Sequence, residues 1–167
     1  MKTIAPNTNY YLLSIKILIF FLFILFIVQG ISRLQDYYEY SGIPITMTSL
    51  IDIVTSKSYF RPALLLVIPT IGIFLQEKIG WVFMVSYFYF LLTNALYPFT
   101  KEYVNDYRMI LFYILISGLV MLLLVGMNKK SIHLTKYHIQ RENLMLSNII
   151  AFVIGVSMTI YLAYARG

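Results

Sequence analysis

The chain of 167 residues is 60% hydrophobic and only 12% charged. A soluble domain carries about 45–50% apolar and about 25% charged residues, and one core of this size could not bury the excess. The composition therefore predicts an all-α integral membrane protein without a soluble domain, a multi-pass protein of the cell membrane. The net charge of +6 comes from residues scattered between apolar blocks, which argues against a nucleic-acid partner. The absence of cysteine excludes disulfides, thiolate zinc sites and cysteine nucleophiles.

Apolar blocks of the length needed to cross a bilayer, about 20 residues, recur along the chain. The first is longer than a signal-peptide core of roughly 7–15 residues and lacks a small-x-small cleavage site, so we expect a permanent span. The sequence predicts one transmembrane domain over 1–167, a bundle of about five helices. The expected spans are 10–31, 61–76, 79–98, 107–127 and 144–164.

The stretch 61–98 is long enough for two passes, and Glu77 and Lys78 fall near its middle. In one tilted helix both charges would lie near the bilayer centre, at a cost of roughly 2.5–3.5 kcal/mol each. Two helices joined by a short turn bring both charges to the headgroups and remove most of this cost. Gly80 is typical of a turn, and Trp81 is expected to anchor the next helix at the membrane interface. The sequence therefore predicts a helical hairpin.

The helix expected at 61–76 is short for a span, which needs roughly 17–25 residues. Pro62 suits the first turn of a helix because its missing N–H costs nothing there. Pro69 is expected to kink the helix, and Pro98 to end the following one. We expect a thin span, with four spans and a re-entrant segment over 62–76 as the alternative.

Lysine and arginine set the expected orientation, because cytoplasmic loops are enriched in them. The loop 128–143 carries four such residues and is therefore placed in the cytoplasm. The turn at Glu77 and the N-terminus with Lys2 then face the cytoplasm too, whereas the loops 32–60 and 99–106 and the C-terminus lie outside. Lys16, near the start of the first span, is expected to extend its ammonium group to the cytoplasmic headgroups.

The outer loop 32–60 begins with a polar segment rich in tyrosine. Its second half is expected to form an amphipathic helix in the interface plane, capped by Thr48 or Ser49. The loop either covers the outer ends of the spans or forms a recognition surface, since tyrosine binds partners at low entropic cost. The candidate recognition residues are Asp36, Tyr37, Tyr38, Glu39 and Tyr40.

Small residues recur at intervals of four along the last expected span. On a helix they form a narrow ribbon down one side. Lipid gives helices no hydrophobic drive to associate, so close backbone approach through small residues holds them together. The ribbon therefore predicts either packing within the chain or docking on another chain. Its members are Ser147, Ala151, Gly155, Thr159 and Ala163.

The third expected span, 79–98, is crowded with aromatic residues that fill space or face lipid. A ring-lined cavity for a lipid-like ligand is an open alternative. Neutral polar residues in the spans, such as Thr93, Asn94 and Asn148, are expected to bond neighbouring helices rather than a substrate.

Catalytic constellations are missing from the sequence, including glycine-rich phosphate loops, His-Glu-x-x-His and Gly-x-Ser-x-Gly. A metal site needs three or four convergent ligands, and the two histidines and one carboxylate at His133, His138 and Glu142 are only a weak signal of one, so we expect solvated loop histidines. On a helix, His138 and Glu142 would share a face. We accordingly expect no catalytic residues, no metal and no cofactor.

These patterns favour a non-enzymatic membrane protein that binds another membrane protein or associates with itself. It would serve as an accessory subunit, a regulator or an immunity-type protein, with the lipid bilayer as its surroundings. The spans contain no Asp or Glu beyond the turn, which argues against ion and proton pathways. The alternative is a small oligomeric transporter or channel for a neutral or apolar solute. An enzyme using the loop histidines is the least favoured hypothesis.

Overall fold

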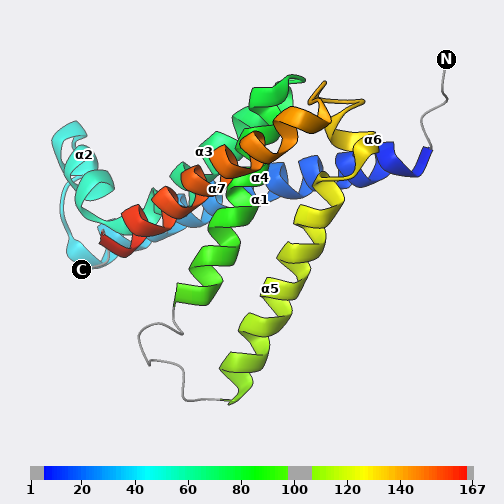
Figure 1. Ribbon diagram of the computed structural model, residues 1–167. Helices are drawn as coiled ribbons and strands as arrows, with labels where there is room; N and C mark the ends of the chain where they lie inside the picture. Colours follow the sequence, from blue (N-terminus) through cyan, green and yellow to red (C-terminus); the bar gives the residue numbers. More distant parts are fainter. Residues whose placement is uncertain (1–5, 98–106, 165–167) are drawn as a thin grey trace.

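The computed structural model describes residues 6–97 and 107–164, and within these ranges the chain forms helices and no strands. Pro98, the loop 99–106 and Lys2, all named in the sequence predictions, lie outside the described residues. The helices in chain order are α1 (Pro6–Ser41), α2 (Met47–Ser56), the 3₁₀ turn η1 (Ser58–Phe60), α3 (Arg61–Phe74), α4 (Lys78–Leu96), α5 (Tyr107–Met127), α6 (Lys130–His133) and α7 (Arg141–Tyr164) (Figure 1).

Four of the described helices are long and apolar enough to cross a membrane, which indicates a multi-pass membrane protein. They are Tyr10–Ser41 of α1, α4, α5 and α7. Helix α3 has only 14 residues, about 21 Å at 1.5 Å per residue, against a hydrocarbon core of about 30 Å. The segment Ser58–Phe74, which is η1 and α3, forms a pair with Met47–Val54 that meets the same criteria but is bent by 60°. The described part of the chain therefore holds four candidate spans, or five if this pair is one broken span.

Helix α1 continues well beyond the expected span 10–31, as far as Ser41. The expectation of a loop from residue 32 onward is therefore wrong for its first ten residues. Polar composition misled the prediction, because 32–41 contains neither proline nor glycine to stop a helix. The stop comes at Gly42, whose φ of +64° is the left-handed conformation of a helix C-terminus. Its N–H donates to the carbonyl of Tyr38 at 3.2 Å.

The chain then returns along α1 in two pieces. Tyr38 is 3.2 Å from Ser49 of α2 between their hydroxyl oxygens. At Gly30, a Cβ would lie 2.8 Å from the ring of Phe60, so η1 crosses α1 there in close contact. Further along, Lys16 donates from Nζ to the carbonyl of Ile73 at 2.6 Å. Helix α3 therefore runs antiparallel to α1 between Gly30 and Lys16.

The N-cap of helix α2 lies two or three residues before the cap predicted at Thr48 or Ser49. Thr46 is the N-cap, and its side-chain oxygen accepts from the N–H of Ser49 at 3.2 Å. The Ser49 hydroxyl in turn accepts from the N–H of Thr46 at 3.0 Å, which completes a capping box. The sequence carries this capping-box pattern, but the third residue of the helix is serine instead of the usual glutamate or glutamine.

The structure places a helical hairpin at the charged pair: α3 ends at Phe74 and α4 begins at Lys78. The two helices approach closely at a pair of glycines, because a Cβ on Gly72 would lie 2.8 Å from the carbonyl oxygen of Gly80. Glu77 is the N-cap residue of α4 and is exposed. Pro69 lies inside α3 and is buried.

Helix α4 is the centre of the packing and contacts α3, α5 and α7 (Figure 1). Ten of its residues are buried, more than in any other described helix. Trp81 is fully buried and donates from Nε1 to the carbonyl of Met127 at 3.1 Å. The prediction that Trp81 anchors the helix at the membrane interface is therefore wrong: the indole N–H finds its partner on α5 instead of at the headgroups.

The basic loop 128–143 is folded back onto the helix ends. Ile132, Tyr137 and Ile139 are buried in the same core as α4. Burial raises the pKa of the Tyr137 phenol, whose hydroxyl points to the sulfur of Met84 at 3.9 Å. His133 is buried as well, with Nδ1 3.0 Å from the carbonyl of Ile139. The expectation of a solvated histidine is thus wrong for His133, because α6 turns it inward.

Several of the described connections and chain ends lie together at one of two ends of the molecule. Leu12 of α1, Gln76 of the hairpin turn and Lys136 of the basic loop line one pocket, so these three segments lie at the same end. Helix α2 and the C-terminal end of α7 lie at the other end (Figure 1). The complete five-span topology and the side of the membrane on which each end lies stay predictions.

We expect Trp81→Phe to lower the free energy of unfolding by about 1–3 kcal/mol, because the buried Met127 carbonyl loses its donor. Denaturation of the purified protein in mild detergent measures this. Tyr107→Phe is the control, since Tyr107 is 75% exposed and surface changes stay within about 0.5 kcal/mol. Equal effects of the two changes would contradict the assignment.

Candidate functional site

The small-residue ribbon lies against α4 of the same chain. Four of its members, Ser147, Ala151, Gly155 and Thr159, are buried, and Ala163 at its end is half-buried. The approach is closest at its centre: a Cβ on Gly155 would lie 2.6 Å from the carbonyl oxygen of Ser86 and 2.7 Å from the N–H nitrogen of Phe90. Real Cβ atoms essentially never come this close to a backbone, so glycine is required here. The ribbon therefore forms an interface between α4 and α7.

Polar side chains cross the same interface at two levels. Near one end, the hydroxyls of Thr93 and Thr159 are 2.6 Å apart. Near the other, Tyr89 donates its hydroxyl to Oδ1 of Asn148 at 3.0 Å, and Asn148 donates from Nδ2 to Oδ1 of Asn128 at 2.8 Å. These bonds satisfy polar groups that lipid could not. The sequence indicated helix-bonding roles for Thr93 and Asn148, whereas Asn128 was placed in the loop and went unnoticed.

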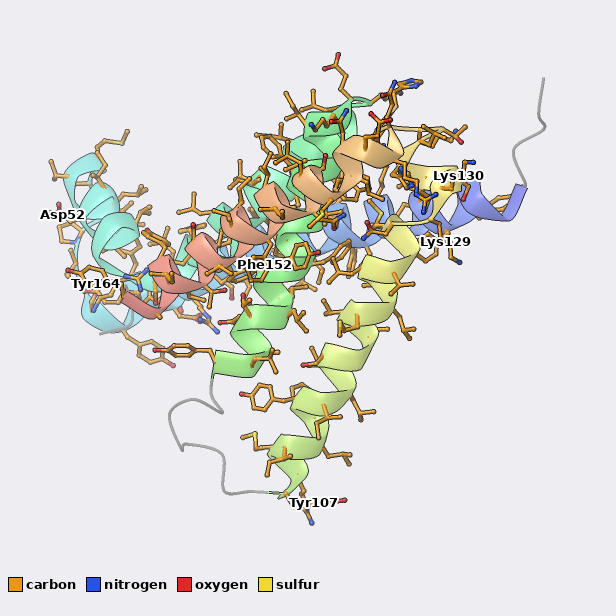
Figure 2. The ribbon with its side chains drawn as sticks, viewed as in Figure 1. Asp52, Tyr107, Lys129, Lys130, Phe152 and Tyr164 are labelled. Carbon is orange, nitrogen blue, oxygen red and sulfur yellow. The ribbon has the colours of Figure 1, made fainter. Side chains whose placement is uncertain are left out.

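An aromatic contact lies beside this polar pair. The rings of Tyr89 and Phe152 meet edge to face, with centroids 5.5 Å apart and an interplanar angle of 88°. Figure 2 shows Phe152 on α7 where that helix passes α4. The aromatic residues of α4 were predicted either to fill space or to face lipid. Tyr89 fills space beside the narrow ribbon.

Comparison with protein-family models, with curated proteins and with solved structures finds no match to this chain.

The tyrosine-rich candidate segment belongs to the last two turns of α1, and its residues divide into two groups. Tyr37 and Tyr38 are half-buried and contact the returning chain. The Tyr37 ring lies 6.5 Å from that of Tyr59, with the ammonium of Lys57 5.5 Å from its centroid. Asp36, Glu39 and Tyr40 are exposed. The inner tyrosines hold η1 and α2 against α1, so the surface open to a partner consists of the other three residues.

The loop histidines do not share a helix face with Glu142. Helix α7 begins at Arg141, and His138 precedes it with a φ of +53°. Among the described residues, no group of three or more His, Asp or Glu side chains is placed to hold a metal ion. His133 instead holds the loop together through its bond to Ile139.

We expect Gly155→Leu to destabilise the protein by about 1–3 kcal/mol or more, because four added carbons meet the backbone of α4 rather than a movable side chain. The thermal unfolding midpoint in detergent measures the loss. Val153→Leu is the matched control on the same helix, since Val153 is 56% exposed. If both variants unfold at the same temperature, α7 does not pack on α4 through the ribbon.

A double-mutant cycle tests the hydroxyl pair. We expect Thr93→Val and Thr159→Val to show a coupling energy of about 0.6 kcal/mol and at most about 1.7 kcal/mol, the range found for interhelical bonds in membranes. Valine keeps the shape of threonine and removes the bond. Additive effects on the free energy of unfolding would show that the hydroxyls do not interact.

Proposed function

We propose that this chain is a non-enzymatic multi-pass protein of the cell membrane that binds another membrane protein through the exposed face of α5. It would act as an accessory subunit, a regulator or an immunity-type protein. The observation that carries the proposal is the open glycine at the middle of that face, Gly118. The ribbon on α7, the other candidate for such a contact, is covered by α4 of the same chain.

Helix α5 is attached to the rest of the molecule mainly by one end. Its principal contact among the described helices is α4. All four of its buried residues, Val120, Leu124, Gly126 and Met127, lie in its last eight positions. Figure 2 shows the two ends: Lys129 and Lys130 follow the packed end beside α1, and Tyr107 marks the other, which extends away. Before Val120 none of the residues of α5 is buried, although Ile116 still packs against the core, so the side of the helix that carries Gly118 is open to the surroundings.

The open face of α5 has the spacing of a helix-packing surface. Its residues recur at intervals of three and four, so they share one side of the helix. All are exposed, and Gly118 lies at their centre. The members are Leu111, Ile114, Leu115, Gly118, Met121, Leu122 and Val125.

Gly118 has no packing role within the described chain. A Cβ at this position would meet nothing within 4 Å, in contrast to Gly155, Gly72 and Gly126. Glycine inside a helix costs about 1 kcal/mol relative to alanine, and close backbone approach is what usually offsets this cost in membranes. Since no described helix approaches Gly118, a helix of another chain is the occupant that fits the position.

The distribution of charged residues supports binding of a partner rather than transport of protons or ions. The apolar stretches 10–31, 107–127 and 144–164 contain no Asp or Glu. Ionisable groups in the membrane are what proton relays and ion pathways use. The interior polar groups are neutral, and those of the α4–α7 interface bond to each other.

We expect Gly118→Leu to abolish co-purification of the partner in mild detergent and to leave the unfolding temperature unchanged or slightly raised. The added side chain enters open space in this chain, and leucine favours helix more than glycine. Val153→Leu, on the exposed side of α7, should retain the partner. A wild-type protein that purifies as a monomer without a partner, or a Gly118→Leu variant that keeps its partner, would overturn the proposal.

One observation favours the transporter alternative. A pocket of about 210 Å³ lies where α1, α3, α4 and α7 meet, lined among others by Tyr87, Phe90 and Asn94. Its described lining carries neutral side chains, which suits a neutral or apolar solute. Solute flux through proteoliposomes of the purified protein that is lost in Asn94→Leu would favour this function over partner binding.

A further inference from the structure

A small polar pocket and a long apolar groove meet at Lys16, near the start of α1. The pocket has a volume of about 220 Å³ and is lined by Leu12, Leu13, Lys16, Gln76, Lys136 and Tyr137. The groove has a volume of about 530 Å³ and runs from the same Leu13 and Lys16 along the exposed side of α1 to Ile24, bounded by Ile73 and Phe74 of α3. Both hollows therefore share one wall, with polar groups at one end only.

The pocket collects positive charge without a carboxylate to balance it. Lys16 and Lys136, from α1 and from the basic loop, both line it. No Asp or Glu is among its described lining residues. The fold places two like charges at one pocket: Lys16 donates to the carbonyl of Ile73 at 2.6 Å, and Lys136 precedes Tyr137, which is buried. An anion would relieve this repulsion.

The lining of the groove indicates that the anion carries a hydrocarbon tail. Apart from the stem of Lys16, its lining is aliphatic or aromatic, including Ile17, Phe20 and Phe21. An apolar channel that starts at a pair of lysines matches a molecule with an anionic head and a hydrocarbon tail. Basic pockets between helices at the membrane surface bind such headgroups, and lysine stems lie along apolar surfaces while their ammonium groups reach polar ones.

We propose that this chain binds one anionic phospholipid at this site, with the phosphate between Lys16 and Lys136 and an acyl chain in the groove along α1. Gln76 offers an additional amide donor to the headgroup from the hairpin turn. A bound lipid would bridge α1, the end of α3 and the basic loop. It would therefore stabilise the same end of the molecule at which Trp81 and Tyr137 are buried.

The test uses the full chain in a mild non-ionic detergent. Its unfolding temperature is titrated with phosphatidylglycerol, with phosphatidylcholine of the same acyl chains, and with inorganic phosphate alone. We expect phosphatidylglycerol to stabilise the protein at lower concentration than phosphatidylcholine, and phosphate alone to have little effect. Equal stabilisation by the two lipids would overturn the headgroup site. Full stabilisation by inorganic phosphate would overturn the role of the groove.

Variants separate this site from general attraction of anionic lipid to basic residues. Lys136→Gln should weaken the apparent affinity for phosphatidylglycerol about fivefold, since one lysine near the membrane surface is worth about 1 kcal/mol. Lys130→Gln is the matched control, because Lys130 is in the same loop but lines a different pocket. Equal weakening by both changes, or none by Lys136→Gln, would overturn the proposal. Lys136 is preferred to Lys16 for this test because Lys16 also bonds to α3.

A second pair of variants tests the tail. Phe21→Ala removes a ring from the groove and should weaken binding of phosphatidylglycerol, whereas Phe112→Ala, on the exposed surface of α5, should not. Native mass spectrometry counts the lipids retained by each variant. Loss of the single tightly held lipid in Lys136→Gln and Phe21→Ala, with retention in both controls, is the expected result. Retention in all four would overturn the assignment.

Discussion

Close backbone contact with α4 is the constraint on which the rest of the structure depends. Gly72 of α3 meets α4 at Gly80, and Gly155 of α7 meets it between Ser86 and Phe90. Because dispersion and interhelical bonding replace the hydrophobic effect between helices in lipid, neighbours must come close to associate. Aromatic residues of α4 lie beside each contact, Phe83 at Gly72 and Tyr89 at Gly155. One aromatic helix thus holds two helices that present small residues to it.

Two kinds of sequence pattern indicated this arrangement before the structure did. The ribbon from Ser147 to Ala163 has a strict period of four, and such a regular spacing of small residues has few origins other than packing. The pair Glu77 and Lys78 located a turn because charge is costly at mid-bilayer. Both predictions followed from the physics of the membrane. The identity of the helix that covers the ribbon could not be predicted, since it depends on which side of α4 each neighbour occupies.

Other features were missed because one physical signal outweighed another. Polarity in 32–41 indicated a loop, although only Gly42 carries the backbone conformation that ends the helix. Lysines in 128–143 indicated a solvated loop, although Ile132, Tyr137 and Ile139 are apolar and buried. Trp81 was assigned to the interface by residue type, whereas its N–H bonds to Met127 inside the core. In the first two cases composition described the average of a segment, and in the third the residue type described its usual location, whereas the fold depends on the contacts of individual residues.

Exposure in a membrane protein has a different meaning from exposure in water, and this decides how its surfaces are interpreted. Leu122 and Phe21 are about equally exposed, at 69% and 61%, and lipid covers either without cost. Apolar side chains alone therefore cannot mark a binding surface. A binding surface is distinguished by a residue whose presence at that position contact with lipid does not account for. On α5 it is a glycine that no described part of the chain approaches, and on α1 it is a lysine that lines one pocket together with a second lysine. Both positions carry an energetic cost within this chain, and a bound molecule of the right chemistry would offset it.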